Sequence, residues 1–319
     1  MRIAVEASGV HLIDTVIRRG EGGGPFPLPD LPMTPGREVA GTVDALGPGV
    51  GPEWLGRRVV AHLGWASGGY AERAVAAVTA LHEVPDTMPA GAAVAMIGTG
   101  RTAMMVLDSA RLTGDDVVLV TAAAGGLGTL FVQAAHNLGA TVVGAAGGPE
   151  KTGRVAEAGA IAVDYLEDGW PQRVQAALRE RQVSVVLDGV GGAAGRAAFE
   201  LLGPSGRHVL FGWSSGEPTR FSAQDLVGKG LTVTALGRPR DLRSLETRAL
   251  ADAAAGRWVP LVQRFPLTEA ARAHRALESR KTAGKGRPVA SPPTRVGLAC
   301  AGGAGRDTHY HNSGGRRGG

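Results

Sequence analysis

The chain has 319 residues, 34 of them Lys or Arg and 29 Asp or Glu, with a formal net charge of +5. This length is sufficient for two domains, each with its own hydrophobic core. Five Arg and one Asp after residue 285 account for +4 of the charge, so the rest is near +1 and we expect no nucleic-acid surface. One Cys, Cys300, excludes an internal disulfide, and no signal peptide is apparent, which favours a cytoplasmic protein.

Residues 1–95 predict a small β-rich domain. Short strand-like runs at 3–5, 38–43 and 58–61 alternate with turns rich in Gly and Pro. An Ala- and Met-rich helix then leads from residue 90 to about 111 into the next domain.

Residues 96–240 predict a nucleotide-binding domain organised around one loop. An apolar, β-branched run at 117–121 reads as a buried parallel strand, and residues 123–128 follow it with the pattern A-x-G-x-x-G. Ala123 permits the tight turn, Gly125 lets backbone N–H groups approach a pyrophosphate, and Gly128 lets the helix pack on the strand. The helix that follows supplies unsatisfied N–H donors at its N-terminus.

A membrane span is the alternative for this region, because residues 117–148 contain no Asp, Glu, Lys or Arg. The pattern changes from strand to helix to strand and is broken by glycines, whereas a spanning helix needs about 20 apolar residues in one conformation. We therefore expect a covered parallel sheet and no membrane segment.

The alternation continues through the rest of the domain and predicts a doubly wound sheet with right-handed crossovers. The expected strands are 141–145, 161–163, 183–187, 207–211 and 231–235, and the expected helices are 149–158, 170–181 and 193–202. Helices at 241–256 and 268–279 form a segment, 241–285, that returns to the first domain.

The order of short motifs resembles the medium-chain dehydrogenase/reductase superfamily, specifically its zinc-free quinone oxidoreductase (zeta-crystallin-like) branch. These motifs are Gly9–Thr15, Pro35–Glu38, Gly68–Glu72, Thr102-Ala103, the glycine loop and Asp188–Gly192. The resemblance implies an α/β fold in which a Rossmann domain and a GroES-like domain hold a nicotinamide cofactor between them. It also implies hydride transfer to a small molecule, a quinone or an α,β-unsaturated carbonyl compound.

A metal ion is not expected. Zinc-dependent relatives need Cys, His and a further Cys or acid around the metal, and the usual His of their Gly-His-Glu motif is Arg37 here. His11, His62 and Glu38 lack the spacing of a ligand set and are as readily explained by packing or hydrogen bonding.

NADPH is the expected cofactor. NAD-preferring sites place an acid after the second strand, where this chain has small residues that include Gly147. Lys151, with Arg154 nearby, is suited to a 2′-phosphate, although an ordinary surface lysine is the alternative. By resemblance, the further cofactor contacts are Ala124, Gly126, Leu127, Tyr165, Val190, Phe211, Gly212 and Trp213. A loop-capping role is equally compatible with Asp188.

His11 and Asp14 are the catalytic candidates, because either side chain could donate or relay a proton. A structural His or a turn-forming Asp explains these residues equally well. The family tyrosine two residues after this Asp is Val16 here, which leaves the mode of quinone binding open.

Three other functions remain as alternatives. An idle cofactor-binding protein of the same fold is one, a methyltransferase lacks its acid after the second strand, and a short-chain dehydrogenase lacks Tyr-x-x-x-Lys. A homodimer is left open.

Both ends of the chain depart from the family pattern. We expect the β-rich domain to lack its first hairpin and its last strand. Residues 286–319 are rich in Gly, Arg and Pro without periodicity, so we expect them to be disordered. One inserted G would convert codons for Val-Val-Leu into codons for Gly-Arg-Pro, which are residues 286–288. We interpret the tail as a frameshift, and a genomic reading frame without a strand-like alternative would refute that interpretation.

Overall fold

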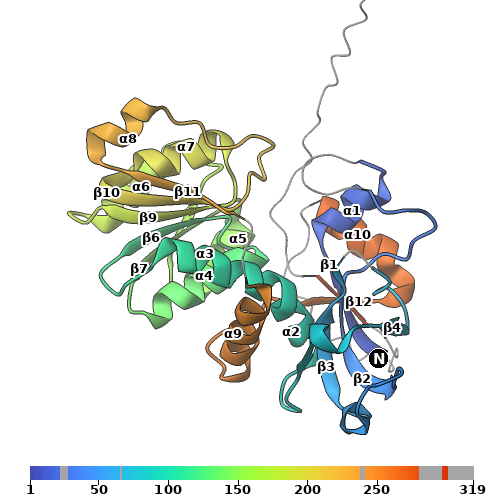
Figure 1. Cartoon of the computed structure of the whole chain (residues 1–319). Helices are drawn as coiled ribbons and strands as arrows, with labels where there is room; N and C mark the ends of the chain where they lie inside the picture. The colour runs from blue at the N-terminus through green and yellow to red at the C-terminus, as the bar shows by residue number, and fades with distance from the viewer. Residues whose placement is uncertain (22–27, 65–66, 238–240, 280–296, 301–319) are drawn as a thin grey trace, which may run out of the picture.

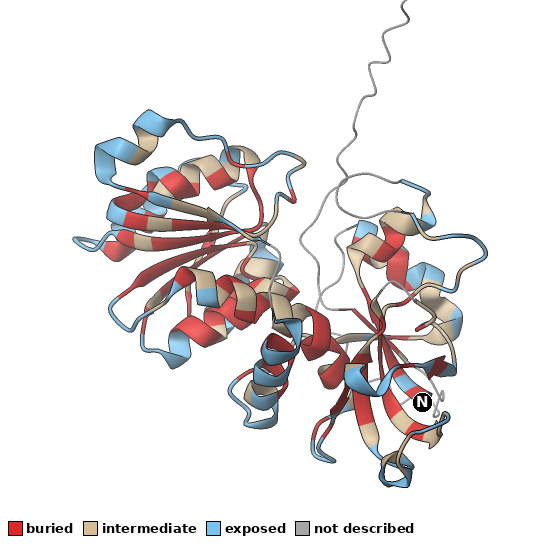
Figure 2. Ribbon diagram, viewed as in Figure 1, coloured by how far each residue is buried: buried red, intermediate tan, exposed pale blue. Residues whose placement is uncertain are grey.

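The computed structural model describes residues 1–21, 28–64, 67–237, 241–279 and 297–300. It has two domains, each built on its own sheet, with helices between them (Figure 1). The predicted fold class, a Rossmann domain beside a β-rich domain, is confirmed. Figure 2 shows the buried positions concentrated in the strands of both sheets and in the helices that join the domains.

The β-rich domain contains a seven-stranded sheet ordered β12-β13-β1-β2-β3-β5, with β4 also paired to β1. Its strands are β1 (Arg2–Val10), β2 (Glu38–Ala45), β3 (Arg58–His62), β4 (Arg73–Val75), β5 (Leu81–Glu83), β12 (Gln263–Pro266) and β13 (Gly297–Cys300). Alternate residues of β1 and β2, including Ile3, Val5, Val39 and Val43, are buried on one face.

A short helix, α1 (Leu12–Arg18), follows β1 directly and was not predicted from the sequence. Its seven residues are too few to show a clear helical period. The helix is stabilised at its first turn, where the Asp14 carboxylate accepts the backbone N–H of His11 at 2.8 Å.

Strand β13 corrects the expectation that the last strand is missing and that everything after residue 285 is disordered. It lies between β12 and β1, antiparallel to the former and parallel to the latter, with Ala7 opposite Gly297. Leu298 and Cys300 are buried, so a four-residue apolar run inside a Gly- and Arg-rich tail completes the sheet. Pairing with two strands supplies the backbone hydrogen bonds that make so short a run ordered. The expected disorder of 286–296 and 301–319 lies outside the described residues.

The second domain contains a six-stranded parallel sheet ordered β11-β10-β9-β6-β7-β8. Its strands are β6 (Val117–Thr121), β7 (Thr141–Ala146), β8 (Ile161–Asp164), β9 (Val183–Asp188), β10 (Leu202–Leu210) and β11 (Thr232–Ala235). Its helices are α3 (Arg101–Ala110), α4 (Gly126–Asn137), α5 (Pro149–Glu157), α6 (Trp170–Leu178), α7 (Gly192–Glu200) and α8 (Ala223–Lys229). Every strand predicted for this sheet is present.

Both faces of this sheet are buried, as its uninterrupted apolar strands require. On β6, Val118 and Val120 pack in the same core as α3 and α4, whereas Val117 and Leu119 pack with α6 and α7. This doubly covered arrangement places the carboxyl ends of the strands, and the loops after them, toward the β-rich domain (Figure 1).

A helical segment joins the two domains. It runs through α2 (Ala90–Ala95), a π-helical turn at Met96–Gly100 and α3. The span Ala90–Ala110 is long and apolar enough to cross a membrane by length and composition, but 67% of it is buried inside the protein, as in a core helix. Helix α9 (Leu242–Ala254) packs on this segment, and α10 (Ala270–Glu278) packs on α1 and β12.

We expect Leu298→Ala to lower the free energy of unfolding by about 2–5 kcal/mol, because it leaves a cavity where β13 fills the core. Leu55→Ala, at a Leu that is 58% exposed, is the matched control and should change it by less than about 0.5 kcal/mol. Urea denaturation followed by circular dichroism measures both. Equal small effects would show that β13 does not pack as described.

Candidate functional site

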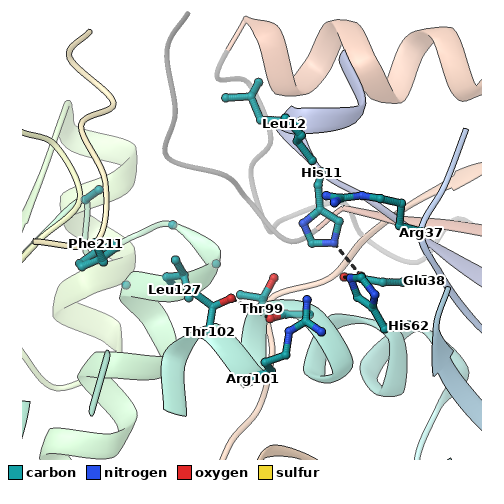
Figure 3. Close-up of a pocket in the computed structure, with 16 residues that line it drawn as sticks. His11, Leu12, Arg37, Glu38, His62, Thr99, Arg101, Thr102, Leu127 and Phe211 are labelled. Carbon is teal, nitrogen blue, oxygen red and sulfur yellow. Dashed lines mark hydrogen bonds and ion pairs between the residues drawn. The ribbon is translucent and has the colours of Figure 1, made fainter. Parts of the chain in front are cut away.

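A cleft of about 280 Å³ lies where the two domains meet. The glycine loop and Phe211 line it from the Rossmann side, and His11, Arg37, Glu38 and His62 line it from the β-rich side (Figure 3). Gly98, Thr99, Arg101 and Thr102, from the π-helical turn and the start of α3, line it between them.

The glycine loop is built as its sequence predicts. Gly125, Gly126, Leu127 and Gly128 all line the cleft at the N-terminus of α4, and in the described residues no side chain caps that helix. The first backbone N–H groups of an α-helix have no partner within the helix, so an uncapped end is suited to a phosphate. A Cβ at Gly128 would lie 2.3 Å from the Ala122 carbonyl oxygen, so only glycine permits this close packing.

The other loops at this edge of the sheet hold the remaining predicted cofactor residues. Phe211 lines the cleft and packs edge to face on Phe131, with ring centroids 5.0 Å apart. Ala123, Ala124 and Val190 are buried beneath the surface of the loops. Gly212 and Trp213 follow β10, and Trp213 is 46% exposed.

Asp188, at the end of β9, accepts hydrogen bonds from several of these loops. One carboxylate oxygen accepts the Thr121 hydroxyl at 2.8 Å and the Val190 and Gly191 N–H groups, and the other accepts the Thr219 hydroxyl at 2.6 Å. Burial acts to raise the pKa of Asp188, but nearby His208, 3.4 Å away, and the hydrogen bond from Thr219 outweigh it and the pKa is lowered. Asp188 is therefore an ionised, loop-capping acid.

The predicted 2′-phosphate residues gather away from the cleft lining, after β7. Gly147 lies beside Tyr165, since a Cβ added to it would be 3.4 Å from the tyrosine ring. Lys151 is in the first turn of α5, and Arg154 is paired with Glu150. Within the described chain Lys151 makes no ion pair, whereas Arg154 does.

Asp164, at the end of β8, forms hydrogen bonds with the backbone of this corner. One of its oxygens accepts the Gly148 N–H and the other accepts the Leu166 N–H, both at 2.9 Å. It is therefore not oriented to take a ribose 2′-hydroxyl, which agrees with the expected preference for a phosphorylated cofactor.

At the other end of the cleft, Glu38 is a buried carboxylate enclosed by two glycines. A Cβ at Gly98 would lie 1.8 Å from Glu38 Oε1, and a Cβ at Gly9 would lie 2.3 Å from Oε2. Glu38 Oε2 is 2.6 Å from His11 Nε2, and Oε1 is 3.8 Å from His62 Nε2. The structure thus assembles three residues whose spacing in the sequence gave no such signal.

The pair formed by His11 and Glu38 is ionic. Burial disfavours the charged form of His11, but the Glu38 carboxylate outweighs it and the pKa of His11 is raised. Burial likewise acts to raise the pKa of Glu38, but His11 outweighs it and that pKa is lowered. Each of the two side chains therefore stabilises the charged form of the other at the cleft.

His62 is the neutral member of this group. Burial, and then the charge of Arg101, lower its pKa to about 4. Its Nδ1 accepts the Gly64 N–H at 3.0 Å, so the proton of the neutral ring is on Nε2, the nitrogen nearest Glu38.

The structure brings His11 to the cleft but not Asp14, the second catalytic candidate. The Asp14 carboxylate is buried, where it accepts the His11 backbone N–H and the Tyr70 hydroxyl, the latter at 3.4 Å. Arg37 Nε lies 3.8 Å from its other oxygen. Asp14 therefore positions His11 and Arg37 rather than facing a substrate.

Arg101 is the main cleft residue that sequence reasoning missed. Its Nη1 donates to Glu246 Oε1 at 2.7 Å, and Glu246 also pairs with His82 at 3.1 Å. No sequence pattern marked it, because its position is fixed by Glu246 of α9, which packs beside α3. The π-helical turn before it is the kind of distortion often found at functional sites.

The described residues contain no group of three His, Cys, Asp or Glu side chains arranged to hold a metal ion. The contact of 2.6 Å between His11 and Glu38 is a direct hydrogen bond. A zinc ion bound by both atoms, at about 2.0–2.2 Å from each, would push them further apart.

Two family models match the chain. The alcohol dehydrogenase GroES-like domain matches residues 1–86, and the zinc-binding dehydrogenase model matches residues 126–254. This pair of domains is the pattern of the medium-chain dehydrogenase/reductase superfamily.

Relatives and solved structures narrow the class. A quinone oxidoreductase of Pseudomonas aeruginosa is 33% identical over 295 residues, and quinone oxidoreductase 1 of Escherichia coli is 32% identical over 307, each alignment covering 89% of both chains. The crystal structure of the Escherichia coli quinone oxidoreductase complexed with NADPH has a TM-score of 0.75 at 30% identity, covering 94% of this chain and 90% of that one. The chain belongs to the medium-chain dehydrogenase/reductase superfamily, in its quinone oxidoreductase branch.

The ionic pair predicts an unusual pH dependence of stability. Because the pKa of His11 is raised in the folded state, its contribution is full below about pH 6.5 and is lost as the pH rises through the folded pKa. Wild-type protein should therefore lose stability as the pH rises above about 6.5, by about 1.4 kcal/mol per unit of raised pKa. In Glu38→Gln, burial alone lowers the pKa of His11, so this loss should vanish. Urea denaturation across that range measures both proteins, and equal slopes would contradict the pairing.

Proposed function

We propose that this protein transfers a hydride from NADPH to a quinone or an α,β-unsaturated carbonyl compound without the help of a metal ion. The observation that carries the proposal is the contact of His11 with buried Glu38 in the same cleft as the uncapped N-terminus of α4. The end of the cleft at α4 is suited to a dinucleotide phosphate, and the end at His11 is suited to a proton transfer.

The chain is an NADPH-dependent oxidoreductase by its family, and its residues fit the cofactor. Structures of the Escherichia coli and Thermus thermophilus quinone oxidoreductases contain NADPH. In this chain the N–H groups of Gly126, Leu127 and Gly128 would hold the diphosphate, and Lys151 with Tyr165 would hold the 2′-phosphate end. Bound NADPH supplies the hydride.

His11 then acts on the acceptor. Hydride addition leaves negative charge on the oxygen of the quinone or of the conjugated carbonyl, and an imidazolium stabilises that charge and can give up its proton. Glu38 keeps the ring charged and fixes its orientation. Solvent restores the proton after each turnover.

Two candidate acceptors follow from the relatives. Most are called quinone oxidoreductases, and a Burkholderia relative that is 31% identical is called a 2-haloacrylate reductase. Both substrates are electron-poor and conjugated, so one hydride donor and one acid serve either. An idle cofactor-binding protein is the alternative, because both ends of the β-rich domain were expected to lack strands. Strand β13 removes one of these two arguments, because it completes the sheet of that domain.

We also propose that the enzyme acts in the cytoplasm.

The assay of this proposal is the loss of NADPH absorbance with a panel of quinones, enones and enals, using protein treated with a chelator. We expect turnover with NADPH that exceeds turnover with NADH, and no loss on chelation. His11→Asn should lower kcat by about 10²–10⁴-fold, the usual contribution of a general acid. Binding of NADPH without turnover of any acceptor would favour the idle protein instead.

Lys151→Gln should weaken use of NADPH specifically. Loss of a charged hydrogen bond to the 2′-phosphate costs about 1.5–3 kcal/mol, roughly a tenfold to a hundredfold loss in kcat/KM. The value for NADH, which lacks that phosphate, is the internal control and should stay the same. Equal losses with both nucleotides would remove Lys151 from the 2′-phosphate site.

A further inference from the structure

Arg101 is held in the cleft by a chain of polar contacts that begins in the sheet of the β-rich domain. Its Nη1 donates to Glu246 Oε1 at 2.7 Å, and Glu246 Oε2 lies 3.1 Å from His82 Nε2 on β5. Glu246 and His82 are buried, and the Arg101 side chain is 17% exposed. Burial acts to raise the pKa of Glu246, but its hydrogen bonds with His82 and Arg101 outweigh it and the pKa is lowered. The chain therefore ends in a guanidinium ion fixed by an ionised carboxylate.

Helix α9, which carries Glu246, has a second anchor on the β-rich domain. Arg243, three residues before Glu246, donates to the carbonyl oxygens of Thr79 and Leu81 at 2.7 and 3.1 Å. On its other side α9 packs on α3, the helix that begins with Arg101. Contacts with two neighbouring elements thus fix the carboxylate of Glu246 behind the cleft.

Arg101 has more hydrogen-bond donors than this carboxylate uses. A guanidinium group has five N–H donors, and one of them makes the bond to Glu246, which is the hydrogen-bond partner of Arg101 among the described residues. Glu246 does not line the cleft, whereas Arg101 does. An ion pair with a purely structural role needs only the side of the guanidinium that faces Glu246. The other donors are available to a molecule in the cleft.

The charge of Arg101 acts at the end of the cleft that holds His11 and Glu38. Burial, and then Arg101, lower the pKa of His62 to about 4. Burial acts to raise the pKa of Glu38, whereas His11, His62 and then Arg101 lower it. Figure 3 shows the side chain of Arg101 extending from the start of α3 into the cleft, on the side of Glu38 and His62. A cation therefore lies near the proposed proton donor.

We propose that Arg101 is a further catalytic residue, which donates to the acceptor oxygen on which negative charge develops, and that Glu246 is its positioning residue. This inference rests on the proposed hydride transfer and names a second group that acts on the acceptor. It applies to quinones and to conjugated carbonyl compounds alike, because both place the developing charge on oxygen.

The electron flow gives a permanent cation a distinct task. For an enone, the hydride from C4 of NADPH forms a C–H bond at the β-carbon, and the displaced electron pair moves onto the carbonyl oxygen. Arg101 binds this oxyanion and gives up no proton, because a guanidinium group stays protonated in proteins. His11 supplies the proton that completes the product. Enone, NADPH and H⁺ give the saturated ketone and NADP⁺.

Chemical rescue tests this assignment, because guanidinium and urea are similar in shape and differ in charge. We expect Arg101→Ala to lower kcat for benzoquinone and cyclohexenone by about 10²–10³-fold, the usual cost of losing one oxyanion donor. Guanidinium chloride at a concentration too low to denature should restore part of kcat, and urea at the same concentration should not.

Three further variants separate charge from space. Arg101→Met, which fills more of the space than Ala, is the second neutral variant and should show the same loss. Arg101→Lys keeps the charge and should retain part of the activity. Glu246→Gln leaves the guanidinium in place but weakens its support, so it should lower kcat less than Arg101→Ala does.

Arg248→Gln is the matched control. It breaks another ion pair between α9 and α3, that of Arg248 with Asp108, and neither residue lines the cleft. It should leave kcat unchanged. Circular dichroism and the melting temperature establish that each variant is folded, and titration with NADPH should give the same Kd for Arg101→Ala as for the wild-type protein.

An NMR titration of His62 gives a readout that needs no turnover. The pKa of His62 should rise from about 4 in Arg101→Met, because the neighbouring charge is removed, and should stay low in Arg101→Lys. A pKa that is the same in both variants would show that the charge of Arg101 does not act at this end of the cleft, which would overturn the inference.

The other contrary results are separable. A kcat that both neutral variants leave unchanged, or that urea restores as well as guanidinium, would overturn this inference and leave the proposed function standing. A raised Kd for NADPH with an unchanged kcat would assign Arg101 to the cofactor, and an equal loss of kcat in Arg248→Gln would assign the effect to the packing of α9. Either result would also overturn it. No turnover of either acceptor by the wild-type protein would overturn the proposed function as well.

Discussion

The arrangement of this site depends on one interaction, the hydrogen bond between the buried carboxylate of Glu38 and the imidazole of His11. A buried carboxylate is costly unless it is paired, and here the partner is a side chain that faces the cleft. Gly9 and Gly98 leave the space that this carboxylate occupies. Asp14 accepts the backbone N–H of His11, so the imidazole ring is held at the N-terminus of α1.

Both domains contribute to the site, and neither contains it alone. The Rossmann domain supplies the uncapped N-terminus of α4, which is suited to phosphates, and the β-rich domain supplies His11 and Glu38. The π-helical turn between α2 and α3 connects them and carries Gly98 directly against Glu38. A cation at Arg101, fixed by Glu246 from α9, completes the cleft. The glycine loop, His11 and Arg101 are thereby held at the ends of packed helices and strands.

The sequence predicted those parts whose signals are local. All six strands of the parallel sheet and the glycine loop were found from hydrophobic period and small-residue spacing. Strand β13 was missed because four apolar residues in a Gly-rich tail have no period, and order there comes from pairing with β1 and β12. The contact of His11 with Glu38 was missed because it depends on the antiparallel register of β1 and β2, which opposes Ser8 to Val39. Arg101 had no signal, since its partners lie more than 140 residues away or in another domain.

The central claim is that the buried carboxylate of Glu38 raises the pKa of His11 in the cleft. The most direct measurement is an NMR titration of the imidazole carbon of His11 in chelated protein, assigned by its absence in His11→Asn. The account predicts a pKa above the ordinary value of about 6.5, and a fall below that value in Glu38→Gln. A wild-type pKa at or below about 6.5 would contradict it.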